Sequence, residues 1–241
     1  MAPSRHDRQL AIPGLGEAGQ ARLAASRLVV LGAGGLGFPV LSYLGAAGVG
    51  RITVVERDEV ELTNLNRQLL FTERDLGRRK ADAARERLTA LDPSLDWRVL
   101  DGSLDLELAS GLCREADLAV DCADNGASRR TLAAAALAAG IPLVHGAVAA
   151  FEGTVCVFGP RGRPCLACLY PEDPAASPAP PPVLGAAVGV VGSLMATEGI
   201  RLLSGIGPPR FGELLLVDLE RRAFDRVPLE PRPGCALCGD G

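Results

Sequence analysis

Lysine is almost missing from this sequence. Of its 25 basic residues, 24 are arginine and only Lys80 is lysine. A GC-rich genome produces an arginine-rich background of this kind. An ammonium group is a compact point charge and a guanidinium is a planar fork, so the two are not interchangeable in a binding site. The sequence therefore raises the question of what Lys80 does that an arginine cannot.

An excess of basic charge and a membrane-spanning pattern are missing as well. The net charge is −4 and the isoelectric point is about 5.3, which argues against a nucleic-acid-binding protein, because such a protein needs a basic face. The uncharged run from Leu132 to Phe151 contains Gly140, Pro142 and His145, a pattern typical of a helix, a turn and a strand and not of a membrane span. The chain opens on charged residues, without a secretory or transit pattern. We expect a soluble cytoplasmic protein that binds neither membrane nor nucleic acid.

Apolar runs of strand length alternate with helical segments up to residue 150. We expect strands at 28–31, 52–55, 96–100, 117–120 and 142–144, separated by helices at 38–47, 78–91, 104–113 and 128–139. This alternation predicts an α/β fold with a Rossmann-like, doubly wound and mainly parallel sheet. Right-handed crossovers then place the ligand crevice at the carboxyl ends of the strands.

The pattern changes after residue 150. Strands at 154–158, 214–218 and 223–228 and a helix at about 186–203 are expected to extend the sheet in antiparallel fashion. Six prolines between Pro171 and Pro182 exclude a helix or a central strand there, and we interpret this segment as a mobile crossover loop. The predicted organisation is an N-terminal helical arm (1–26), a nucleotide-binding half (27–150) and an antiparallel extension (151–241).

A glycine-rich turn joins the first expected strand to the first expected helix. Gly34, Gly35 and Gly37 allow the backbone to turn tightly and approach a phosphate, and the helix that follows offers free N–H groups. Glu56 follows Gly37 by 19 residues, at the end of the next strand, where a carboxylate bonds ribose hydroxyls. The turn fits an NAD-dependent dehydrogenase as well as an ATP site, and a purely structural glycine turn is a further interpretation.

Polar and basic residues after Glu56 favour ATP over NAD. They are Asn64, Arg67, Gln68 and Lys80. A triphosphate carries more negative charge than a pyrophosphate, so it needs additional donors and a Mg²⁺ ligand. Asp124 directly follows a strand and is the candidate for that ligand. Local interpretations exist as well. The pair Asp124-Asn125 directly after a strand is often a turn or a helix cap, and an arginine or lysine on an amphipathic helix is usually solvated.

The cysteines fall into two classes. Cys165 with Cys168 and Cys235 with Cys238 form two CxxC pairs in Gly/Pro contexts. Two such pairs can close a tetrahedral structural zinc site, and disulfides or chance pairing are the alternatives. The solitary cysteines are interpreted as small buried hydrophobic residues; they are Cys113, Cys122 and Cys156.

The motifs follow one order along the chain. They are Arg8-Gln9-Leu10, Gly32-Ala33-Gly34-Gly35-Leu36-Gly37, Asn64-Leu65-Asn66-Arg67-Gln68, Gly77-Arg78-Arg79-Lys80, Asp121-Cys122-Ala123-Asp124-Asn125 and the two CxxC pairs. In this combination, which covers nearly the whole chain, the sequence resembles the MoeB/ThiF/HesA family, the bacterial relatives of ubiquitin-activating enzymes.

This resemblance implies a role for each motif. Gly34, Gly35 and Gly37 would cradle ATP, Glu56 would hold its ribose, and Asn64, Arg67, Gln68 and Lys80 would surround the triphosphate. Asp124 would bind Mg²⁺. Arg8 resembles the family arginine that reaches the γ-phosphate in the neighbouring subunit, which implies a homodimer with the N-terminal arm as a contact. The catalytic roles would thus fall to Arg8, Arg67, Lys80 and Asp124.

The activity implied is adenylation of the C-terminal glycine carboxylate of a small ubiquitin-like sulfur-carrier protein with a Gly-Gly tail, of the molybdopterin or thiamin type. A carboxylate is ionised at neutral pH and needs no general base, so neither His6 nor His145 is required. Three alternatives remain open: ATP-dependent activation of another carboxylate, on a tRNA base or a peptide; an NAD-dependent oxidoreductase; and a non-catalytic carrier-binding scaffold.

Two departures from the family pattern affect these expectations. Glu56 stands where the family more often has aspartate, and the longer side chain still allows ribose bonding. The crossover segment from Pro171 to Gly185 is unusually rich in proline and contains no cysteine. We therefore expect adenylation without a covalent thioester or acyl-disulfide at that position.

Overall fold

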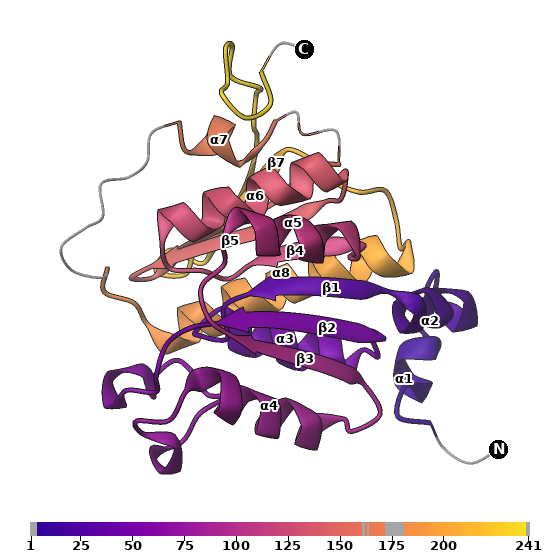
Figure 1. The fold of residues 1–241 in the computed structure, drawn as a ribbon. Helices are drawn as coiled ribbons and strands as arrows, with labels where there is room; N and C mark the ends of the chain where they lie inside the picture. Colours follow the sequence, from indigo (N-terminus) through magenta and orange to yellow (C-terminus); the bar gives the residue numbers. More distant parts are fainter. Residues whose placement is uncertain (1–3, 161, 163, 172–180, 240–241) are drawn as a thin grey trace.

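One mixed sheet of eight strands forms the centre of the protein (Figure 1). The computed structural model describes residues 4–160, 162, 164–171 and 181–239. The strands are β1 (Arg27–Leu31), β2 (Arg51–Glu56), β3 (Asp96–Asp101), β4 (Leu118–Asp121), β5 (Leu143–Ala149), β6 (Glu152–Phe158), β7 (Glu213–Asp218) and β8 (Ala223–Pro228). Their spatial order is β3-β2-β1-β4-β5-β6-β7-β8. The neighbouring strands in the run β3-β2-β1-β4-β5 pair in parallel, and β6, β7 and β8 are added to β5 in antiparallel fashion. This arrangement confirms the predicted fold class.

Helices cover both faces of the sheet (Figure 1). They are α1 (Asp7–Leu10), α2 (Gly16–Ala25), α3 (Gly37–Ala46), α4 (Lys80–Leu91), α5 (Leu106–Arg114), α6 (Gly126–Ala139), α7 (Leu166–Leu169) and α8 (Gly185–Ser204), with 3₁₀ turns η1 (Leu62–Asn64) and η2 (Glu73–Asp75). Helices α3, α4 and α8 share an apolar core with one face of the sheet, and α5, α6 and α7 share a second core with the other.

Local sequence signals account for the ends of α6. Asn125 caps its first turn, because the side-chain oxygen accepts a hydrogen bond from the Ser128 N–H at 2.9 Å. Gly140 ends the helix in the left-handed region, with φ of +70°. Because β4 ends at Asp121 and Asn125 already caps α6, residues 122–124 form a short loop at the carboxyl end of β4.

Helix α8 crosses the molecule against α3. A methyl group at Gly192 would lie 2.2 Å from the ring of Pro39, so the two helices approach closely only because residue 192 is glycine. Among the described residues, α8 is long and apolar enough to cross a membrane by length and composition. Val191 and Met195 are fully buried in the core of this protein, and α8 also contacts β5 and β6. One face of α8 therefore belongs to the core of the protein.

The carboxyl ends of β1 and β2 point toward the segment 57–79, at the left of Figure 1, and α1 and α2 lie at the opposite end of these strands. Most of the expected crossover loop, residues 172–180, lies outside the described residues. Strands β5 and β6 pair along their whole length as a hairpin, so one sheet continues through position 150. The division of the chain there stays a prediction.

Candidate nucleotide site and four-cysteine cluster

The glycine turn between β1 and α3 depends on close backbone approaches. Gly32 has φ of +94°, and a methyl group there would lie 2.9 Å from the Cys122 carbonyl oxygen. A methyl group at Gly37 would lie 2.3 Å from the Gly32 carbonyl oxygen. Both positions therefore require glycine for internal packing. The same contacts bring the turn beside the loop that carries Asp124.

The outer side of the turn contacts two further segments. A methyl group at Gly34 would meet the Gln68 amide at 3.4 Å, and one at Gly35 would lie 2.9 Å from Val188 in the first turn of α8. At Gly185, where α8 begins, a methyl group would lie 2.3 Å from the Asn66 carbonyl oxygen. The glycine turn, the loop 64–68 and the N-terminus of α8 thus meet at the carboxyl edge of the sheet.

Glu56 fastens the glycine turn to the end of β2. Its carboxylate is buried and accepts hydrogen bonds from the Ala33 N–H at 2.8 Å, the Arg57 N–H at 2.7 Å and the Asp58 N–H at 2.9 Å. Two carboxylate oxygens offer about four acceptor positions, so three N–H donors leave room for a further donor such as a ribose hydroxyl. The ribose contact itself stays a prediction.

The loop 64–68 contains one buried polar group without a partner. Gln68 is buried beside Gly34, and its Oε1 has no hydrogen-bond partner among the described residues. Asn64 is also buried, but its side-chain oxygen accepts from the Glu61 N–H at 3.2 Å and caps η1. An unpaired buried amide costs free energy, so the Gln68 side chain is the stronger sign of a ligand at this turn.

Arg67 and Lys80 bring positive charge to the same edge. The Arg67 Cγ would lie 3.8 Å from a methyl group at Gly35, and its guanidinium donates to the Thr63 carbonyl at 2.7 Å. The Lys80 side chain is only 6% exposed, and its Nζ lies 3.4 Å from Asp58 Oδ2. That single long contact leaves most of the three ammonium donors for other acceptors.

Asp124 presents a free carboxylate beside the turn. It is exposed, and no hydrogen bond or ion pair to it is present within the described part of the chain. Its neighbour Asn125 caps α6, so within the pair Asp124-Asn125 the helix-cap interpretation is correct for Asn125. A carboxylate oxygen at a strand end is a suitable ligand for Mg²⁺. Its metal role stays a prediction.

A hollow of about 150 Å³ lies elsewhere, at the amino ends of β1 and β2. Three arginines line it together with the end of α5; they are Arg27, Arg51 and Arg98. None of the residues predicted to bind the nucleotide contributes to this hollow. The predicted site and this hollow therefore lie at opposite ends of the strands.

Arg8 lies far from the glycine turn of its own chain. It is an exposed residue of α1, beside the amino ends of the strands (Figure 1). The arm is anchored around it, because Arg5 pairs with Asp92 at 2.9 Å and Gln9 donates to the Ala47 carbonyl at 3.0 Å. Within one chain Arg8 therefore cannot join the other predicted residues.

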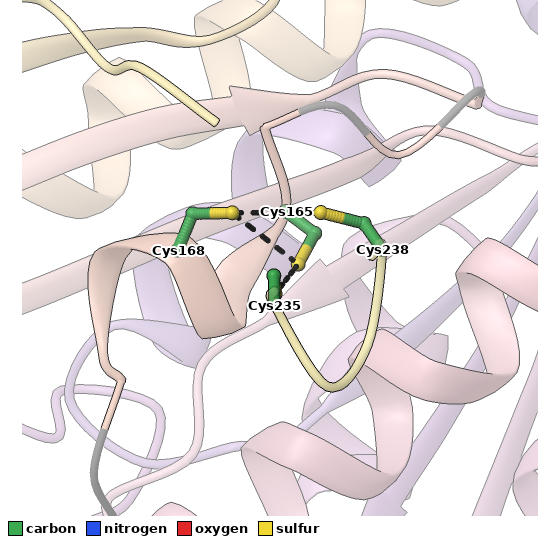
Figure 2. Close-up of side chains that lie close together, drawn as sticks. All are labelled: Cys165, Cys168, Cys235 and Cys238. Atoms are coloured by element: carbon green, nitrogen blue, oxygen red, sulfur yellow. Dashed lines mark hydrogen bonds between the residues drawn. The ribbon is translucent and has the colours of Figure 1, made fainter. Parts of the chain in front are cut away.

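The four paired cysteines converge on one point (Figure 2). Cys165 and Cys168 come from α7 and its N-cap, and Cys235 and Cys238 come from the C-terminal turn. All four sulfurs lie within 4.8 Å of one another, with Cys165–Cys235 at 3.6 Å and Cys168–Cys238 at 3.5 Å. Tetrahedral zinc with bonds of about 2.3 Å places its sulfurs about 3.8 Å apart, so this cluster fits zinc.

Backbone N–H groups surround part of the cluster. Burial alone would raise the pKa of the Cys235 thiol, but the backbone N–H groups of Cys238 and Leu237, together with the neighbouring thiols of Cys165 and Cys238, lower it to about 6. The pKa values of Cys165 and Cys238 are raised instead, first of all by burial. The Arg232 N–H donates to Cys168 Sγ at 3.3 Å. Such N–H donors stabilise thiolates, which are the form that binds zinc.

The solitary cysteines are buried, as expected. Burial raises the pKa of Cys113 to about 11 and that of Cys156 to about 12. The pKa of Cys122 is also raised by burial, next to Asp121. All three thiols are therefore protonated at neutral pH, and none is suited to act as a nucleophile.

The sequence did not predict the hydrogen-bonded group formed by Asp121, His145 and Tyr170. His145 Nδ1 lies 2.7 Å from Asp121 Oδ2, and its Nε2 lies 3.2 Å from the Tyr170 hydroxyl. Both His145 and Asp121 are fully buried. The only signal in the sequence was that Asp121 opens the motif that contains Asp124.

Known proteins match the chain over nearly its full length. The model of the ThiF family matches residues 6–237. A sulfur carrier protein adenylyltransferase from Thermus thermophilus is 44% identical, over 98% of this chain and 90% of that protein. A molybdopterin-synthase adenylyltransferase from Escherichia coli is 38% identical, over 98% of this chain and 96% of that protein. The crystal structure of E. coli MccB with ATP has a TM-score of 0.82 at 22% identity, covers 92% of this chain and 68% of that one, and shows a shared fold.

Proposed function

This chain belongs to the ThiF family, and we propose that it adenylates the C-terminal glycine carboxylate of a small ubiquitin-like sulfur-carrier protein with ATP, releasing pyrophosphate. Relatives matched over nearly all of the chain are named as sulfur-carrier and molybdopterin-synthase adenylyltransferases. In the structure, the observation that supports this function is the meeting of the glycine turn, the loop 64–68 and the Asp124 loop at the carboxyl edge of the strands.

The residues of this site suit a nucleoside triphosphate. The unpaired amide of Gln68 lies against Gly34, and the N-terminus of α3 offers N–H groups to a phosphate. Arg67 and Lys80 would offset the negative charge, and Glu56 would hold the ribose. Asp124 would hold Mg²⁺, which neutralises phosphate charge when bound.

The reaction needs positioning and charge more than proton transfer. A carboxylate oxygen of the carrier would attack the α-phosphorus, forming an acyl phosphate bond while the bond to pyrophosphate breaks. The attacking carboxylate is already ionised at neutral pH. Lys80, as a compact charge, would follow the phosphate through its change of geometry, and Arg67 would stabilise the departing pyrophosphate.

An ATP–pyrophosphate exchange assay with a panel of Gly-Gly-tailed carriers tests this function. We expect exchange with at least one carrier, dependent on Mg²⁺ and lost when the final glycine is deleted. Tight NAD binding without ATP binding would support the oxidoreductase alternative. Exchange with a tRNA base or an unrelated peptide carboxylate, and none with carriers, would show that a different carboxylate is activated. Carrier binding without exchange would indicate a scaffold.

A homodimer that shares Arg8 between subunits is part of the proposal. Arg8 projects from the anchored arm and makes no ion pair with the described residues of its own chain. A second copy would supply it to the γ-phosphate across the interface. The zinc assignment and a cytoplasmic location are likewise predictions that accompany this function.

Coexpression of two inactive chains tests the shared arginine. An Arg8→Ala chain and a Lys80→Met chain, each inactive alone, are expected to recover about a quarter of wild-type exchange when mixed at random, because half of the dimers are mixed and each of these has one intact site. The two chains carry different tags, so that mixed dimers can be purified and assayed directly. Verified mixed dimers without recovered activity would show that Arg8 does not act across the interface.

A further inference from the structure

Asp121 and His145 form a buried polar pair that the proposed reaction does not use. Asp121 ends β4, His145 lies on β5, and the two residues are directly opposite each other in the parallel ladder. Both are fully buried, with His145 Nδ1 at 2.7 Å from Asp121 Oδ2. Burial keeps His145 away from any substrate, so it is not a catalytic base. A buried charge of this kind is costly unless it is fully hydrogen-bonded.

Tyr170 completes the bonding of His145 from the other side. The tyrosine hydroxyl lies 3.2 Å from His145 Nε2, and the two rings meet edge to face with centroids 5.5 Å apart. The phenol O–H of Tyr170 is a hydrogen-bond donor, and it can donate to an unprotonated Nε2. The imidazole then carries its proton on Nδ1 and donates to Asp121.

The second carboxylate oxygen of Asp121 holds the backbone next to Asp124. Its Oδ1 accepts from the Ala123 N–H at 3.0 Å. Arg129 Nε donates to the Ala123 carbonyl at 2.9 Å and lies 3.7 Å from Asp121 Oδ2. Both backbone polar groups of Ala123 are therefore held by side chains, and Asp124 is the next residue.

We propose that His145 is a positioning residue: held by Tyr170, it orients Asp121, which together with Arg129 fixes the backbone at Ala123 and directs the Asp124 carboxylate toward Mg²⁺. This inference rests on the proposed function, in which Asp124 binds the metal. Tyr170 follows Cys168 by two residues, so the residue that holds His145 is close in sequence to the four-cysteine cluster.

The Mg²⁺ dependence of ATP binding, measured by calorimetry, tests the role of His145. We expect His145→Leu to raise the Mg²⁺ concentration for half-maximal ATP binding by about 10-fold, in line with the loss of other residues that orient metal ligands. ATP binding in EDTA stays unchanged, because the glycine turn is intact. His145→Asn keeps an amide donor near the position of Nδ1 and is expected to stay within about 3-fold of wild type.

Two further variants separate positioning from general destabilisation. Tyr170→Phe removes one hydroxyl without leaving a buried charge unpaired, and it is expected to raise the Mg²⁺ requirement by about 3-fold even if His145→Leu folds poorly. Asp117→Ala removes the acceptor of the Arg27 N–H at the amino ends of β1 and β4, the end of the strands opposite the site, and is expected to lower the melting temperature without changing the Mg²⁺ requirement.

The outcomes distinguish this inference from the function on which it rests. The positioning role is wrong if folded His145→Leu and Tyr170→Phe proteins both keep the wild-type Mg²⁺ requirement, or if His145→Asn is as impaired as His145→Leu. Asp124→Asn is measured alongside. If Asp124→Asn leaves the Mg²⁺ requirement unchanged, then Asp124 is not the ligand, and the metal assignment in the proposed function fails together with the positioning role.

Discussion

Replacing Lys80 with arginine is expected to slow ATP–pyrophosphate exchange by about 10-fold or more, a loss of about 1.4 kcal/mol in transition-state stabilisation, although the charge is kept. The side chain at position 80 is 6% exposed and opens helix α4, with its Nζ directed to Asp58 at 3.4 Å. A planar guanidinium is larger than an ammonium group and does not fit the same buried space. It also cannot follow a phosphate as a point charge does.

Lys80→Met removes the charge and is expected to cost about 100- to 1000-fold in exchange rate, as for other buried groups that stabilise charge in a transition state. The fold should be retained, because the partner carboxylate of Asp58 is 45% exposed and remains hydrated. Single-turnover formation of the acyl adenylate is the measurement. Arg85→Met removes an exposed charge from the same helix that contacts Asp82 and the Val99 carbonyl, not the candidate site, and serves as the control. Wild-type rates in Lys80→Arg and Lys80→Met would remove Lys80 from the mechanism.

Loss of the four-cysteine site is expected to lower the melting temperature by about 10 °C, from a stability loss of about 3 kcal/mol in a chain of this size. Cys165 and Cys235 are both buried, and the cluster connects α7 to the C-terminal turn. Without a metal, four converging sulfurs lose the bonds that hold them together. Cys235→Ser is the variant, measured by differential scanning calorimetry.

Metal content is measured on the same samples. Purified wild-type protein is expected to contain about one zinc ion per chain by elemental analysis, and Cys235→Ser to contain none. Cys113→Ala is the matched control, because Cys113 is fully buried in the core beside α6 and lies outside the cluster. Zinc-free wild-type protein with an unchanged melting temperature would show that the cysteines serve another purpose.

Much of the fold could be predicted from local patterns. The strand expected at 28–31 is β1 (Arg27–Leu31), and the helix expected at 186–203 is α8 (Gly185–Ser204). Strand and helix periodicities are local properties, and glycine or proline marks the ends. The glycine turn and the paired cysteines could be predicted for the same reason, since each motif lies within a few residues of sequence.

Other features have no local signature. His145 and Asp121 are 24 residues apart and meet only because β4 and β5 pair in a register that places them opposite each other. Tyr170 reaches them from the C-cap of α7, a helix of four residues that no periodicity could indicate. The local interpretation was right for Asn125, a helix cap, and only the structure separates it from the exposed Asp124 beside it.

By itself, the sequence determined the class of the fold, the order of its strands and helices, and the identity of the groups that suit a triphosphate and zinc, because these depend on short-range patterns and side-chain chemistry. The tertiary structure alone decided which of those groups meet. It brought Gln68 against Gly34, placed Arg8 at the far end of the sheet, and enclosed Asp121 with His145. Such contacts between residues far apart in sequence depend on strand register and helix packing. No single stretch of sequence specifies the register or the packing on its own.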